Sequence, residues 1–307
     1  MKVMWIVATA IAAMVSSSAL AQQTTPPPAA PPDFSKAEIK TTDLGHRTYM
    51  LEGVGGNITV AAGNDGVIMI DSQFEPMHDK IKAAVQAATG LPIRYVVNTH
   101  FHGDHTGGNA AFAADGAVIA AQANVRRRLA EGSVSGLTGA KTPPRTGAAL
   151  PTDIFTDDMT LKIPGRSAEL KHIENAHTDG DTYVYWTDAN VLSTGDTMST
   201  GRYPNIDFAN VGNIKGMIAA TDRFLEFVND DTKIVPGHGS LATKADLVNY
   251  RTMLVTARDR MAKLIADGKS EQDAITARPF ADYDAKLGIN DQASQNFIRV
   301  VYHSLKP

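Results

Sequence analysis

The chain has 307 residues, contains no cysteine and carries a formal net charge of −4, with acidic and basic residues interspersed. Its length allows one large α/β domain or two smaller ones. The charge pattern argues against nucleic-acid binding and against a polybasic membrane arm. The one basic run, Arg126–Arg128, is interpreted as a solvated helix face. Without disulfides, stability depends on the core and on any bound metal.

The N-terminus has the pattern of an export signal. Lys2 precedes the apolar run Val3–Val15, and Ala19–Ala21 forms an A-x-A cleavage site. We expect residues 1–21 to be a signal peptide, whose removal leaves a periplasmic or secreted protein without a membrane anchor. The alternative is an uncleaved anchor, for which the apolar run is short.

A proline-rich stretch, QQTTPPPAAPP, comes next, and residues 22–33 are predicted to form a disordered tether. Residues 34–307 are predicted to form the folded domain. In its first half, short apolar runs between glycines predict strands at Thr48–Glu52, Asn57–Ala62, Gly66–Asp71, Ile93–Thr99 and Ala117–Ala121. Helical periodicity predicts helices over Met77–Ala88 and Gln122–Glu131.

The second half repeats this plan of strands followed by helices. Strands are predicted at Met159–Ile163, Leu170–Glu174, Tyr183–Trp186, Val191–Ser193 and Lys233–Val235, with a helix over Ile214–Val228 before the last of them. Two such halves indicate two packed sheets with helices outside. Capping boxes at Thr243–Asp246 and Ser270–Asp273 and a cap at Asp291 predict helices at the C-terminus. The aperiodic stretch Gly132–Pro151 is either a flexible lid near a site or a surface insertion.

The stretch THFHGDHTGG places three histidines and an aspartate within six residues, directly after a predicted strand. His100 and His102 are two apart, so in extended backbone their side chains point the same way and can reach one ion. Asp104 and His105 follow in a turn that Gly103 allows, and they can serve a second ion close by. Zinc takes imidazole and carboxylate ligands in small sets, so further ligands must come from distant segments.

Three later loops offer such ligands. His177 lies in NAHTDGD, Asp196 in STGDT and His238 in PGHGS, each just after a predicted strand. Loops at one edge of a sheet often assemble the functional site of an α/β protein. The isolated histidines are interpreted as structural or surface residues: His46, His78, His172 and His303.

The motifs THFHGDHTGGN, NAHTDGDTYVYW, STGDT and PGHGS occur in this order and together resemble those of the metallo-β-lactamase superfamily, over residues 44–240. The resemblance implies an α/β fold, a four-layer αββα sandwich with metals at the edge between the sheets, here with C-terminal helices. It also implies two metal-ligand sets. The first set is His100, His102 and His177; the second set is Asp104, His105 and His238; and Asp196 bridges both.

The resemblance implies the chemistry as well. Two zinc ions share a hydroxide that attacks a carbonyl carbon, because metal binding lowers the pKa of water to roughly 7. Asp104 is expected to act in catalysis by orienting that hydroxide. Asp71, which ends GVIMID, is expected to support the metal loop from behind. Imidazole-rich sites also accept iron or manganese.

The chain is therefore predicted to be an exported, zinc-dependent, β-lactamase-like hydrolase that opens a cyclic amide or ester of a small-molecule substrate. Export favours a lactam. Asp196 favours the alternative, a lactonase or a thioesterase like glyoxalase II, because lactamases with this ligand pattern usually lack that aspartate. A non-catalytic metal-binding accessory protein is the third possibility. Arg202, Tyr203, Asn205 and the Val54–Asn57 hairpin either line the substrate pocket or are ordinary loop residues; the oligomeric state is left open.

Overall fold

The computed structural model describes Met1 and residues 33–306. The predicted signal peptide beyond Met1 and residues 22–32 of the predicted tether lie outside the described residues. The chain from Asp33 onward forms one compact unit. Within the described part of the chain, no helix is both long and apolar enough to cross a membrane.

The first sheet has seven strands in the order β1-β2-β3-β4-β5-β6-β9, antiparallel from β1 to β4 and parallel from β4 to β9. The strands are β1 Lys40–Gly45, β2 Thr48–Glu52, β3 Ile58–Ala62, β4 Val67–Ile70, β5 Ile93–Asn98, β6 Val118–Gln122 and β9 Asp153–Phe155. Parallel strands end at one edge of the sheet. Asp71, after β4, and Thr99, after β5, therefore lie side by side there.

The second sheet has five strands in the order β10-β11-β12-β13-β14, antiparallel except for the last pair. The strands are β10 Asp158–Ile163, β11 Arg166–His172, β12 Thr182–Trp186, β13 Val191–Ser193 and β14 Lys233–Val235. Ser193 of β13 is in register with Val235 of β14. The loops after these two strands therefore leave the sheet together.

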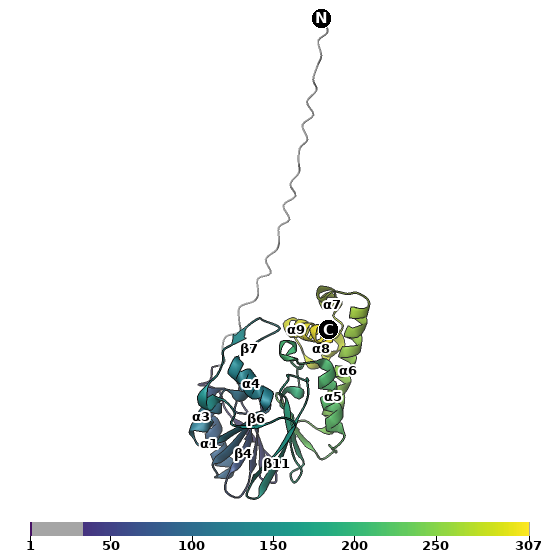
Figure 1. Cartoon of the computed structure of the whole chain (residues 1–307). Helices are drawn as coiled ribbons and strands as arrows, with labels where there is room; N and C mark the ends of the chain where they lie inside the picture. The colour runs from purple at the N-terminus through teal and green to yellow at the C-terminus, as the bar shows by residue number, and fades with distance from the viewer. Residues whose placement is uncertain (2–32, 307) are drawn as a thin grey trace. The chain divides into compact units, whose positions relative to one another are not determined.

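Helices cover the outer face of each sheet, as Figure 1 shows for α1, α3 and α4 on one side and α5 and α6 on the other. The helices are α1 His78–Thr89, α2 Gly103–Thr106, α3 Asn109–Ala114, α4 Ala123–Glu131, α5 Ile214–Leu225, α6 Lys244–Ala266, α7 Glu271–Ala277, α8 Ala281–Leu287 and α9 Asp291–Leu305, with short 3₁₀ turns η1 Glu75–Met77, η2 Gly147–Ala149, η3 Gly195–Thr197 and η4 Phe208–Asn210.

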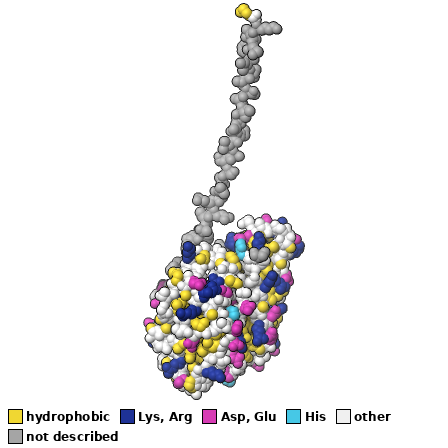
Figure 2. All heavy atoms as spheres, viewed as in Figure 1, with side chains coloured by type: hydrophobic (Ala, Val, Ile, Leu, Met, Phe, Trp, Pro, Cys, Tyr) yellow, Lys and Arg dark blue, Asp and Glu magenta, His cyan; other side chains and the backbone are white. Residues whose placement is uncertain are grey.

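Three apolar clusters account for the layers. One cluster joins the two sheets and includes Ile70 and Val97 from the first and Val184 and Trp186 from the second. The others pack each sheet against its own helices. The four-layer αββα sandwich with C-terminal helices is thus confirmed. Charged side chains of both signs are interspersed over the face shown in Figure 2.

Several local predictions differ from the structure. β1 and β9 carry no periodic pattern that predicted them, and the stretch Gly132–Pro151 contains a two-stranded hairpin, β7 Ser133–Val134 and β8 Lys141–Thr142. β7, β8 and β9 have two or three residues and no run of apolar residues to mark them, and β1 is a mostly exposed edge strand without alternating apolar residues. The predicted cap at Asp291 is wrong, because Asn290 caps α9 by accepting a hydrogen bond from the backbone of Ala293.

Candidate metal centre

The structure brings all seven predicted ligands to one edge of the sandwich. Four chain segments supply them: the turn after β5, the loop between β11 and β12, η3 after β13, and the loop after β14. The loops after β13 and β14 stay side by side because these strands are in register, and a further backbone bridge pairs Ser199 with His238. That each of these side chains binds a metal stays a prediction, and the distances between them are compatible with it.

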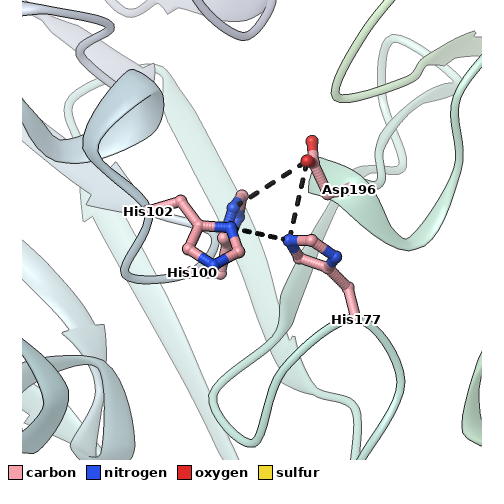
Figure 3. Close-up of side chains that lie close together, drawn as sticks. All are labelled: His100, His102, His177 and Asp196. Carbon is pink, nitrogen blue, oxygen red and sulfur yellow. Dashed lines mark hydrogen bonds and ion pairs between the residues drawn. The ribbon is translucent and has the colours of Figure 1, made fainter. Parts of the chain in front are cut away.

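In the first set, the three imidazoles converge beneath Asp196, as Figure 3 shows. The Nδ1 atom of His102 lies 2.9 Å from Nε2 of His177. Oδ2 of Asp196 lies 3.6 Å from His177 Nε2 and 4.0 Å from His100 Nε2. These four ligand atoms all lie within 4.8 Å of one another, a span that one metal ion can fill.

The second set lies directly beside the first. His238 Nε2 is 3.2 Å from Asp104 Oδ2 and 3.4 Å from His105 Nε2. Asp196 faces this set too, with Oδ1 3.2 Å from His105 Nε2 and Oδ2 3.5 Å from His238 Nε2. The carboxylate of Asp196 is therefore placed to serve both sets, as its predicted bridging role requires.

Asp71 supports a histidine in each ligand set through hydrogen bonds. Its Oδ2 accepts hydrogen bonds from His105 Nδ1 and from the Thr99 hydroxyl, each at 2.8 Å. Because the Thr99 hydrogen is used in that bond, its oxygen accepts from His100 Nδ1 at 3.1 Å. One buried carboxylate thus fixes the tautomer of a histidine in each set and turns the opposite ring nitrogen toward the metal position.

Two further supports were missed by sequence reasoning. His102 Nε2 donates to Asp207 Oδ2 at 2.9 Å, and His177 Nδ1 donates to the backbone oxygen of Asn205 at 2.8 Å. Asp207 is also held by Asn210, whose side-chain amide donates to Oδ2 at 2.8 Å. His102 and Asp207 are 105 positions apart, and no local motif marks that partnership.

Close packing around the ligands requires glycine at two positions. A Cβ atom at Gly56 would lie 2.1 Å from the His105 ring, and one at Gly237 would lie 2.0 Å from Asp196 Oδ1. The backbone of Gly56 also donates to the carbonyl of Asp104 at 3.0 Å. The Val54–Asn57 hairpin therefore abuts the second set.

The basic run on α4 has a partner. Arg127 and Arg128 bind the carboxylate of Asp179 at 2.7 and 2.8 Å, in the same loop as His177. The interpretation of Arg126–Arg128 as a solvated face is therefore wrong for Arg128, whose side chain is 16% exposed, and holds for Arg127, whose side chain is 43% exposed. They clamp the His177 loop onto α4.

The donor set fits a metal. His100 Nε2 and Asp196 Oδ1 are buried, and within the described residues neither forms a hydrogen bond. Such unpartnered polar atoms are costly unless something binds them. A site of imidazole nitrogens and carboxylate oxygens suits zinc, and also iron or manganese.

The electrostatics of His100, His177 and Asp196 agree with metal binding. Burial lowers the pKa of His100 well below its usual range and that of His177 to about 4. Burial alone would raise the pKa of Asp196, but the neighbouring His105 and His238 hold it well below its usual range. Two neutral imidazoles and an ionised carboxylate are the forms in which these groups coordinate a metal.

Comparison with known proteins agrees with this geometry. Residues 51–238 match the family model described as "Metallo-beta-lactamase superfamily". The chain belongs to this superfamily. Solved structures agree on the fold: a metallo-β-lactamase from Pontibacter korlensis has a TM-score of 0.59 at 19% identity, covering 71% of this chain and 99% of that one. A sec-alkylsulfatase from Pseudomonas sp. has a TM-score of 0.63 at 18% identity, covering 87% of this chain and 50% of that one.

Two curated proteins are similar to this chain in sequence. A hydroxyacylglutathione hydrolase from Polaromonas sp. is 26% identical over 66% of this chain and 70% of its own length. The alpha subunit of a 2,4-dinitroanisole O-demethylase from Nocardioides sp. is 30% identical, but the match covers 47% of this chain and 42% of that protein. Superfamily members are generally hydrolases, so the chain is placed among metal-binding hydrolases.

The residues suggested to contact the substrate differ in where the structure places them. Tyr203 is buried, and its hydroxyl donates to Asp284 at 2.8 Å, so it anchors the C-terminal helices instead of lining a pocket. Arg202 is exposed. Asn205 lines a cavity beside His102.

Proposed function

We propose that this chain is a metal-dependent hydrolase of thioesters and esters, including cyclic esters. The observation that carries the proposal is Asp196, whose carboxylate faces both ligand sets at 3.2 to 4.0 Å. The hydroxyacylglutathione hydrolase supports the same substrate class, because the match covers 70% of its length.

We propose that the first set and the second set each hold one ion, zinc in the first instance, with Asp196 between them. Bound metal would supply a water of lowered pKa and an electrophile for the carbonyl oxygen. Asp104, whose side chain is 30% exposed, is the ligand that a substrate reaches most easily. Its carboxylate is placed to orient the attacking water and accept its proton.

The proposal is tested on the full-length chain loaded with zinc. Hydrolysis of a hydroxyacyl thioester, a γ-lactone and a chromogenic cephalosporin is compared, with His102→Ala as the control. We expect the thioester or the lactone to be hydrolysed faster than the cephalosporin, and the control to be inactive. Fastest opening of the cephalosporin would replace this proposal with β-lactamase activity. A zinc-loaded chain inert toward all three would indicate a metal-binding accessory protein.

We further propose that the chain is exported, on the sequence pattern of residues 1–21. The intact mass of the protein purified from expressing bacterial cells tests this. A mature chain beginning at Gln22 and recovered outside the cytoplasm is expected. A chain that retains Met1 contradicts the proposal.

A further inference from the structure

A cavity of about 150 Å³ lies beside the metal centre and shares His102 with it. Its walls come from the β7–β8 hairpin and from the segment Asn205–Phe208, which are far apart in sequence. At roughly 30 Å³ per water, this is space for about five waters. It suits a small fragment of a substrate and is too small for a whole drug-sized ligand.

One wall of the cavity is lined by hydroxyl groups. Ser133 and Thr142 are paired across β7 and β8, so their side chains share one face of the hairpin. Ser135 Oγ accepts from the backbone of Thr138 at 3.3 Å, and Thr138 Oγ1 accepts from the backbone of Ala140 at 3.2 Å. Both hydroxyls keep their hydrogens, which can be donated to a ligand.

The opposite wall is apolar and held in place. Ile206 and Phe208 line it, and Leu137 adds an apolar side chain from the hairpin. The Phe208 ring stacks on His303 of α9, with centroids 4.8 Å apart. A Cβ atom at Gly136 would lie 2.6 Å from this ring, so the hairpin lies directly on Phe208.

The charges around the cavity select against anions. Among the described residues that line it, none is a lysine or arginine. Its two ionisable residues, His102 and Asp207, are hydrogen-bonded to each other at 2.9 Å. Among the side chains that line the cavity, a carboxylate or phosphate would find no cationic partner and would face Asp207.

We propose that this cavity is a subsite for a compact, uncharged fragment of the substrate that carries a hydrogen-bond acceptor. The hydroxyls of Ser135 and Thr138 bind the acceptor, and Phe208 packs against the carbon atoms. The assignment of this fragment to a hydrolysed substrate rests on the proposed function. The binding of a neutral fragment does not.

Binding is tested by amide NMR on the full-length, zinc-loaded chain titrated with butanamide or with butyrate, which differ in charge and little in shape. We expect butanamide to shift the amide signals of the hairpin, with a dissociation constant at least about tenfold below that of butyrate at the same signals. Ser135→Phe fills the cavity and should abolish these shifts. Ser167→Phe, at an exposed position on β11, is the matched control and should keep them. Equal binding of the two probes, or shifts that survive Ser135→Phe, would overturn the subsite.

Turnover separates this inference from the proposed function. A butanoyl thioester should show a KM raised about tenfold or more by Ser135→Phe, with little change in kcat, whereas a succinyl thioester should be a poor substrate of all variants. Phe208→Leu provides a milder test of the apolar wall. Turnover with the same KM in Ser135→Phe and Ser167→Phe overturns the subsite and leaves the function. Hairpin binding of butanamide without any hydrolysis supports the subsite and overturns the function.

Discussion

The two ligand sets differ in how firmly the protein holds them. In the first set, each imidazole has its outer nitrogen bonded: His100 to Thr99, His102 to Asp207 and His177 to the backbone of Asn205. In the second set, within the described residues only His105 has such a partner, and the side chains of Asp104 and His238 are 30% and 17% exposed. The first set is therefore preorganised for a metal by a hydrogen bond to each imidazole, whereas the second set is held by fewer such bonds.

The largest expected effect comes from removing a ligand of the preorganised set. His102→Ala should lose the metal of the first set and all measurable hydrolysis, because the remaining ligands cannot complete a four-coordinate site. Metal content by elemental analysis, together with turnover, checks this. His46→Asn, at an exposed position in the turn between β1 and β2, is the control for loss of an imidazole. Full turnover by metal-free His102→Ala would exclude the metal mechanism.

Asp71→Ala should affect both sets at once. It leaves His105 and Thr99 without their buried acceptor, and loss of one partner of a buried ion pair typically costs about 3–5 kcal/mol. Urea unfolding of the metal-free variant measures this cost. A change of ~0.5 kcal/mol or less, as at ordinary surface sites, would mean that Asp71 does not carry this role.

Asp207→Asn should weaken only the first set. Replacing the carboxylate that accepts from His102 should lower metal affinity about 10–100-fold, the usual range for such outer partners. Competition with a chromophoric chelator measures both affinities. Asp188→Asn, which alters an ion pair of Arg166, is the matched control. Equal weakening of both sets would contradict the separate support described above.

The smallest expected effect is the pH dependence of the unfolding free energy of the metal-free protein. Burial lowers the pKa of His177 to about 4, so between pH 6.5 and 4 the unfolded chain binds more protons and stability falls as the pH falls. Although burial opposes it, Asp196 and Asp104 raise the pKa of His238 to about 9, so between pH 6.5 and 9 stability falls as the pH rises.

Unfolding free energies of the metal-free chain and of two variants across this range separate these two slopes from those of other buried groups, such as Asp181, whose pKa burial raises to about 7. His177→Gln should flatten the acid side and His238→Gln the alkaline side. A profile that keeps both slopes in both variants would assign the dependence to other groups.

Much of the fold was predictable because its signals are local. The strand before THFHGDHTGG and the capping boxes of α6 and α7 follow from residues adjacent in sequence. The ligands after β11, β13 and β14 could be predicted because each follows a strand end beside small residues. Their placement at one edge then follows from the sandwich.

What could not be predicted depends on tertiary contact. The bond between Asp207 and His102, the stacking of Phe208 on His303 and the clamp of Arg128 on Asp179 join residues that only the folded chain brings together. Tyr203 shows the converse. Its position after the Asp196 loop suggested a pocket residue, but an apolar environment and Asp284 draw it into the core.

Phe208 connects the metal centre to the C-terminal helix α9. It follows Asp207 directly and stacks on His303, so the last helix and the metal ligand His102 are tied to the same short segment. Binding free energies are reciprocal: a metal that stabilises this segment must also stabilise α9, and α9 must contribute to metal affinity. Metal loading should therefore slow amide hydrogen exchange in α9, although that helix supplies none of the seven proposed ligands.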